Sequence, residues 1–140
     1  MYTITRSITL KHGEKVNVKL IVKEEDRKVI AIADEKICGS GYLKFIAKKI
    51  IYDFFINKGL IHVQFAYDSK LGNDLNLESY YRTIATCDPD DTWDEKTGIK
   101  IALNKMKSKL DLVIDKRLSL FLNKLDKGVE SFADKFFLNE

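Results

Sequence analysis

Cysteine, histidine, proline and tryptophan are scarce in this chain of 140 residues, with two, two, one and one of each. Two cysteines cannot build the disulfide framework of a small secreted protein, so we expect a reducing, cytoplasmic location. The side chains with metal-binding chemistry, Cys38, Cys87, His12 and His62, have no close pair of the kind a zinc site needs. We therefore expect no metal and no cofactor. A Cys–His nucleophilic pair stays open, although no spacing favours one.

Long apolar runs and a strong net charge are also absent. No uninterrupted apolar stretch approaches the ~20 residues that cross a bilayer. The chain opens at Met1 directly into strand-like alternation, so we expect no signal peptide. A formal net charge of +3 permits contact with nucleic acid or an acidic protein and requires neither. With 45% hydrophobic and 32% charged residues, the composition is that of one globular domain, with room for an appended element.

The first third of the chain alternates apolar and polar residues, which is typical of half-buried strands. We expect strands over residues 2–10, 15–23 and 28–34, with turns at 11–14 and 24–27. Such short links join antiparallel strands and cannot carry a parallel crossover. The three strands therefore predict an antiparallel meander.

A helix, a strand, a loop and another strand follow. Ser40 is a good N-cap and Gly59 lies where a C′ glycine belongs, so the spacing predicts a helix between them. We expect strands over 61–67 and 78–86, separated by a loop over 68–76. The order β-β-β-α-β-β predicts an α+β domain over residues 1–94, with an antiparallel sheet of about five strands.

Residues 95–140 predict a helical C-terminal extension. Ten apolar residues from Leu103 to Phe136 recur about every 3.67 residues, which is a helical period. Gly128 is a place where this pattern can divide into two helices, so one helix or two stays open. Around Leu118 the apolar residues cover about half the circumference, wider than the ~100° stripe of a surface helix. We expect this extension to pack on the sheet and to form a homodimer; a monomer with its tail folded back is the alternative.

Four aspartates lie between Asp88 and Asp94. They do not form an EF-hand, because Trp93 replaces the required glycine and Ile99 the bidentate glutamate. Helix capping is the favoured interpretation: Asp88 as an N-cap before Pro89, then Asp94 as the cap of the long helix. In this interpretation Trp93 packs against the core and Gly98 marks close packing on the sheet. Cation binding by the aspartates is the alternative.

The same stretch carries a pattern of spaced residues, C-x-P-x-D-x-W-D-x3-G-x3-A, from Cys87 to Ala102. This segment resembles one found in small, mostly uncharacterised phage and prophage proteins, which usually have phenylalanine where this chain has Trp93. The resemblance covers about 20 of the 140 residues. It implies a phage origin and a bacterial host cell more than any activity. The tail beyond Lys105 lies outside the pattern.

With no catalytic constellation in view, we expect a non-enzymatic accessory protein that binds a host protein or ribonucleoprotein complex. Inhibition of a bacterial defence system, such as a CRISPR effector, is one such role and rests on analogy alone. The residues expected to contact the partner are four apolar side chains with two rim charges: Leu112, Leu120, Leu122, Phe137, Lys107 and Lys109.

Nucleic-acid binding is the alternative function. It rests on two lysine groups, one on a strand and one on a helix flank: Lys15, Lys19 and Lys23, then Lys44, Lys48 and Lys49. Of the neighbouring Tyr80 and Tyr81, only one can face the core, which leaves the other for stacking on a base or a partner. Arginine is scarce, so solvated lysine faces are favoured over a nucleic-acid site.

Overall fold

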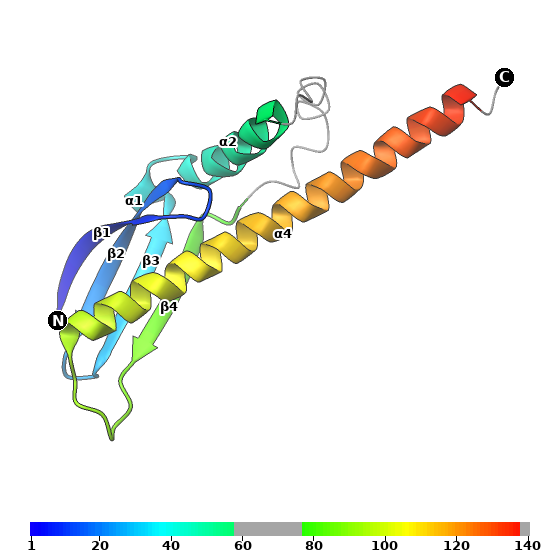
Figure 1. Cartoon of the computed structure of the whole chain (residues 1–140). Helices are drawn as coiled ribbons and strands as arrows, with labels where there is room; N and C mark the ends of the chain where they lie inside the picture. The colour runs from blue at the N-terminus through cyan, green and yellow to red at the C-terminus, as the bar shows by residue number, and fades with distance from the viewer. Residues whose placement is uncertain (58–76, 138–140) are drawn as a thin grey trace.

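The computed structural model describes residues 1–57 and 77–137, and the expected strand over 61–67, the loop over 68–76, Gly59 and His62 lie outside them. The elements are β1 (Tyr2–Thr9), β2 (Lys15–Lys23), β3 (Lys28–Asp34), α1 (Glu35–Cys38), α2 (Tyr42–Asn57), β4 (Tyr80–Thr86) and α4 (Glu95–Phe137) (Figure 1). The sheet has the order β1-β2-β3-β4, and every neighbouring pair is antiparallel. The α+β class and the meander are confirmed. Four strands are described where about five were expected.

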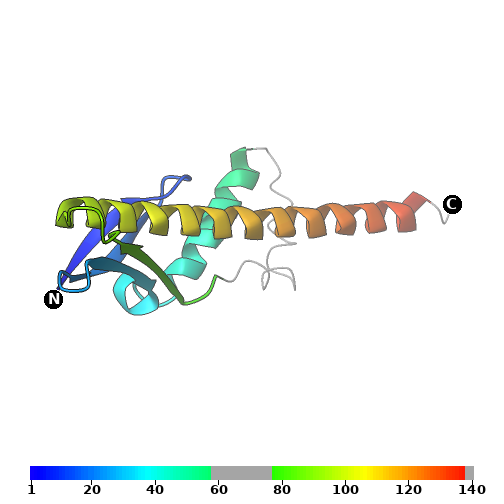
Figure 2. The same cartoon turned by 90° about the horizontal axis from the view of Figure 1, so that it is seen from below.

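The hydrophobic core lies between one face of the sheet and the helices. In β2 the alternate residues Val16, Val18, Leu20 and Val22 are fully buried. The helical side of the same core comes from the inward residues of α2 and α4, which are Leu43, Ile46, Ala47, Ile50, Ala102, Met106, Leu110 and Ile114. The α4 residues of this core are four positions apart in the sequence, so they lie on one side of that helix. Figure 2 shows α4 running along one side of the sheet and past its end.

Helix α4 is a single helix of 43 residues and continues through Gly128. At 1.5 Å per residue it is about 65 Å long. Its last residue in the shared core is Ile114, so roughly half of the helix extends beyond the sheet (Figure 1). The helix therefore does not divide at Gly128, and its course is not that of a tail folded back on the sheet.

The start of α2 differs from the expectation. Gly41, at a φ of 74°, accepts the first helical hydrogen bond from the Phe45 amide. The Glu35 carboxylate reaches back from α1 and accepts from the Tyr42 amide at 2.9 Å. Ser40 was therefore the wrong N-cap, because a neighbouring helix supplies the capping carboxylate. Helix α1, capped by Asp34, was not predicted.

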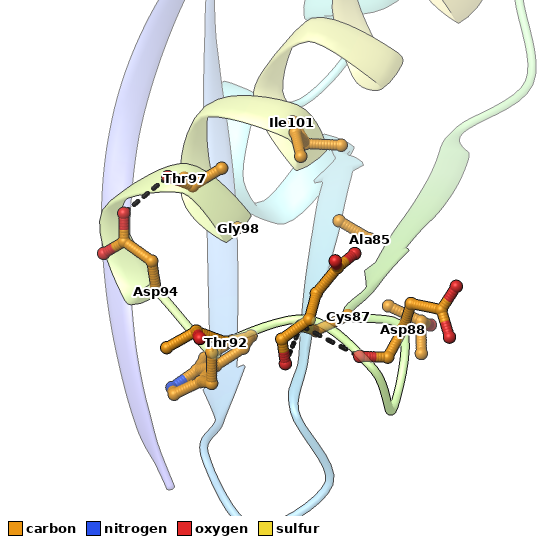
Figure 3. A pocket seen from close by; sticks show the side chains of 11 residues that line it. Ala85, Cys87, Asp88, Thr92, Asp94, Thr97, Gly98 and Ile101 are labelled. Atoms are coloured by element: carbon orange, nitrogen blue, oxygen red, sulfur yellow. Dashed lines mark hydrogen bonds between the residues drawn. The ribbon is translucent and has the colours of Figure 1, made fainter.

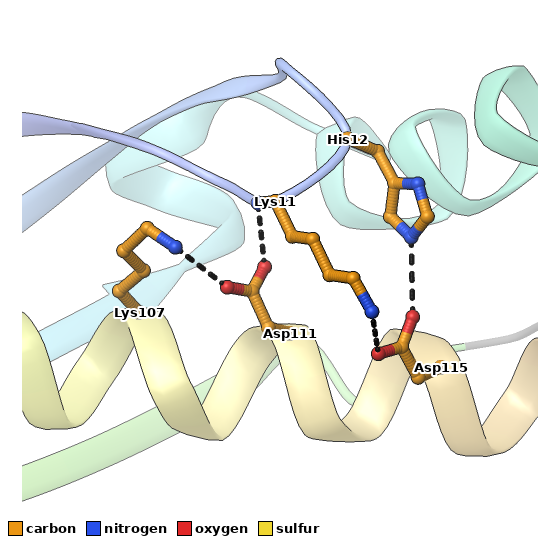
Figure 4. Close-up of polar contacts among 5 residues, drawn as sticks. All are labelled: Lys11, His12, Lys107, Asp111 and Asp115. Atoms are coloured by element: carbon orange, nitrogen blue, oxygen red, sulfur yellow. Dashed lines mark hydrogen bonds and ion pairs between the residues drawn. The ribbon is translucent and has the colours of Figure 1, made fainter.

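The β1–β2 turn is tied to the middle of α4 by charged side chains (Figure 4). The Asp115 carboxylate lies 3.0 Å from Lys11 Nζ and 3.1 Å from His12 Nε2. The Lys11 amide donates to Asp111 at 2.9 Å. Burial alone would raise the pKa of Asp115, but the hydrogen bonds from His12 and Lys11 outweigh it, so the pKa lies below the ordinary value. The tether holds the hairpin on the helix.

We expect Asp115→Asn to lower the free energy of unfolding by about 0.5 kcal/mol at neutral pH, because the carboxylate is partly exposed and screened. A lowered folded-state pKa means that the unfolded chain binds more protons, so this contribution is present above the ordinary carboxyl pKa of about 4 and is lost as pH falls through the folded value. Urea unfolding at neutral pH and near pH ~2 measures this. Asp90→Asn, at an exposed aspartate, is the control. A difference that persists in acid would contradict the ion-pair account.

Candidate interaction surfaces

The segment between β4 and α4 borders a cavity of about 430 Å³ (Figure 3). Its lining includes Cys87, Asp88, Trp93 and Asp94. Asp88 does not begin a helix: the Asp91 amide donates to its carbonyl at 3.0 Å and closes a turn. The expected N-cap at Asp88 is therefore wrong, because the chain turns once and straightens. The expected helix start after Asp94 is confirmed, since α4 begins at Glu95, and the Thr97 hydroxyl donates to the Asp94 carboxylate at 2.5 Å.

Arg27 organises this segment from the β2–β3 turn. It has a positive φ of 53°, and its carbonyl accepts from the Cys87 amide at 2.8 Å. Its guanidinium donates to the carbonyls of Pro89 and Asp91 and to the Cys87 sulfur. Sequence reasoning missed this role, because the partners are about 60 residues apart and no local pattern joins them. The guanidinium therefore holds the loop in place through two backbone carbonyls and one sulfur atom.

Two of the side chains with metal-binding chemistry, Cys38 and His12, make hydrogen bonds within the fold. Within residues 1–57 and 77–137, no group of three or more histidine, cysteine or acidic side chains is placed to hold a metal ion. Burial raises the pKa of the Cys38 thiol, which donates to the Asn17 carbonyl at 3.2 Å. A thiol with a raised pKa is a poor nucleophile at neutral pH. His12 bonds to Asp115, and no hydrogen bond joins it to either cysteine.

The residues expected to contact a partner lie along α4 in different environments. Leu112 is 69% exposed and Leu120 is 44% exposed, whereas Leu122 is half-buried. The side chain of Phe137 lies outside the description. Lys107 pairs with Asp111 at 2.9 Å, and Lys109 donates to the Arg82 carbonyl at 3.1 Å. Leu112 and Leu120 are therefore the apolar side chains that α4 presents to solvent at this level of the helix.

Lysines of α4 cover the outer edge of the sheet. Lys105 donates to the Ile84 carbonyl at 3.0 Å, and Lys109 does the same at Arg82. Both carbonyls belong to β4, the last strand in the sheet order. Free edge carbonyls are a template for pairing with another chain, and lysines are a common means of blocking that. The Lys109 ammonium, which was expected to contact a partner, is thus hydrogen-bonded to the sheet of its own chain.

The structure separates the two lysine groups. Lys15, Lys19 and Lys23 lie on the β2 face turned away from the core. Lys44, Lys48 and Lys49 lie on the outer side of α2, where Lys49 pairs with Glu14 at 3.1 Å. Hydrogen bonding to Glu14 raises the pKa of Lys49. Sequence reasoning missed Lys28 and Arg82, which the sheet register places beside the β2 group.

No known family model matches the chain, and neither the curated proteins nor the solved structures contain a significant match. The resemblance of the Cys87–Ala102 segment to phage proteins therefore stays a prediction. None of the described helices is long and apolar enough to cross a membrane.

Proposed function

We propose that this protein is a non-enzymatic accessory protein of phage origin that acts in a bacterial host cell by binding another protein. The observation that carries the proposal is the course of α4. It shares the core of the sheet as far as Ile114, its last side chain described as buried is Phe121, and it continues as one helix to Phe137. In water most helical stability comes from packing of an apolar face. A helix that continues its apolar pattern beyond its own domain is suited to pack on another chain.

Two parts of α4 serve this function in the proposal. The distal part repeats Leu125, Val129, Phe132 and Phe136 at helical spacing in the sequence, and we assign it to a homodimer. The middle part exposes Leu112 and Leu120, which we assign to a host protein or ribonucleoprotein complex. Inhibition of a bacterial defence complex, such as a CRISPR effector, is one form of this function and rests on analogy alone.

Light scattering on two truncated chains tests the homodimer. A chain ending at Asn123 keeps every side chain that the structure describes as buried, the last being Phe121. We expect the full chain to be a dimer and this truncation to be a monomer that still unfolds cooperatively. A chain ending at Phe137 is the matched control and should remain a dimer. A full chain that stays monomeric at every concentration would contradict the assignment of the distal helix.

A further inference from the structure

The face of the sheet turned away from α4 has a distinct side-chain pattern. Its residues alternate with the buried ones along the strands, and we call it the open face; its polar and aromatic members include Lys19, Lys23, Lys28, Asp34, Tyr80 and Arg82. The core residues of α2 and α4 pack with the opposite face. Ile30 illustrates the separation, since it is only 4% exposed and yet lies outside the main core cluster. The open face is thus a second surface with its own apolar centre.

The strand register arranges this face in rows. Ile21 lies opposite Ile30, which lies opposite Ile84, so three isoleucines form an apolar row across three strands. On one side of it Lys23 lies opposite Lys28. On its other side, the next row on the same face, about 7 Å away, runs from Lys19 through Ile32 to Arg82. An apolar row is therefore flanked by cations on both sides.

The cations of the open face have no acidic partners among the described residues. Asp34 is the acidic residue at the end of β3, and its carboxylate accepts a hydrogen bond from the Ile37 amide at 2.9 Å. The neighbouring turn carries three acidic residues, Glu24, Glu25 and Asp26. The ion pairs of the described residues include neither these acids nor the four cations of the open face, which are Lys19, Lys23, Lys28 and Arg82. Like charges directly opposite on neighbouring strands, such as Lys23 and Lys28, destabilise a sheet. An anionic ligand removes that repulsion, whereas a second copy of the same face would increase it.

We propose that the open face binds single-stranded nucleic acid. Lys19, Arg82 and the Lys23–Lys28 pair contact phosphates, and bases lie over the isoleucine row. Tyr80 is 48% exposed and lies two residues from Arg82 on the same face, where its ring stacks on a base. Apolar and aromatic side chains on an open sheet bind the flat faces of bases, which a single strand exposes and a duplex hides in its stack. This proposal goes beyond the protein-binding role of α4 and uses a different surface.

Fluorescence anisotropy of the full chain with labelled oligothymidine and oligouridine tests the proposal. We expect tighter binding to these strands than to a duplex hairpin of the same length. Four phosphate contacts predict that log affinity falls against log salt with a slope of about −3. No binding at low salt would overturn the proposal. Equal affinity for the duplex would overturn it as well, because it would show attraction by charge alone.

Two double variants with the same formal net charge localise the binding. Lys19→Glu with Arg82→Glu should lower the affinity for oligothymidine by at least about tenfold. Lys96→Glu with Lys100→Glu changes two exposed lysines at the start of α4 and should leave the affinity near that of the native chain. Equal losses in the two variants would contradict the open face as the site.

Two single variants separate binding from folding. Tyr80→Ala should lower the affinity about fivefold or more while Tyr80→Phe retains it, because stacking needs the ring and not the hydroxyl. Lys28→Glu should weaken binding and raise Tm by a few degrees, since it places an acid opposite Lys23. Loss of affinity with a raised Tm cannot arise from unfolding. Unchanged affinity in both Tyr80→Ala and Lys28→Glu would overturn the proposed contacts.

Discussion

Replacement of Leu110 by alanine is expected to lower the free energy of unfolding by about 3 kcal/mol. Leu110 is 1% exposed and belongs to the core shared by α4, α2 and the sheet. Truncation removes the transfer energy of three carbon atoms and leaves a cavity that the β-strands cannot collapse to fill. Urea unfolding followed by far-UV circular dichroism measures the change.

Leu112→Ala is the matched control for that experiment. The two leucines are two residues apart on the same helix, but Leu112 is 69% exposed. Its replacement should change the free energy of unfolding by no more than about 0.5 kcal/mol. Equal costs at the two positions would mean that α4 does not present Leu110 to the sheet.

Replacement of Gly98 by valine is expected to lower the free energy of unfolding by about 2–3 kcal/mol. A Cβ at this position would lie 3.1 Å from Val29 Cγ2 and 3.3 Å from the Trp93 ring. The first turn of α4 therefore approaches β3 too closely for a branched side chain. Gly98→Ala should stay within about 1 kcal/mol of the native chain, because its gain in helix propensity offsets the tight contact.

Lys100→Val is the control for the low helix propensity of valine. Lys100 is exposed on the same turn, so the substitution should cost only about 0.5 kcal/mol. Thermal unfolding of the three variants compares them under one condition. If Gly98→Val were as stable as Lys100→Val, the close approach of α4 to Val29 would be refuted.

Much of the fold could be predicted from the sequence, because several of the patterns that indicate strands and helix starts are local. Alternation of apolar and polar residues in β2, and an apolar run after a polar turn in β3, predicted both strands with their observed bounds. Asp94 and Gly98 correctly predicted where α4 begins and where it approaches the sheet. The cap of α2 was missed because Glu35 reaches it from another helix. The turn at Asp88 was misread because an N-cap and a turn favour the same residues.

The surfaces were harder to predict than the fold. Lys19 and Lys23 were recognised from one strand, but Lys28 and Arg82 join them only through the sheet register. That register pairs β3 with a strand about 50 residues later, which no local pattern reveals. The sequence placed one lysine group on a strand and the other on the flank of a helix, and the structure places them on β2 and α2. Exposure of Leu112, Leu120 and Leu122 was expected from the wide apolar face of the helix; the structure exposes the first two and leaves Leu122 half-buried.

The two proposals place different partners on different surfaces. Helix α4 extends from the sheet with exposed leucines suited to a protein, and the open face carries cations around an apolar row suited to a nucleic acid strand. A host ribonucleoprotein complex offers both kinds of ligand. The proposals do not depend on each other, because the variants that test the open face leave Leu112 and Leu120 unchanged.

Site-specific photo-cross-linking in bacterial cells tests the protein-binding role most directly. A photoreactive amino acid at position 112 or 120 captures whatever chain lies against α4, and one at Asp90, an exposed turn position, serves as the control. The proposed function predicts a discrete adduct with another protein at 112 and 120 that is absent at 90. The same faint adducts at all three positions, with no discrete product at 112 or 120, would contradict it.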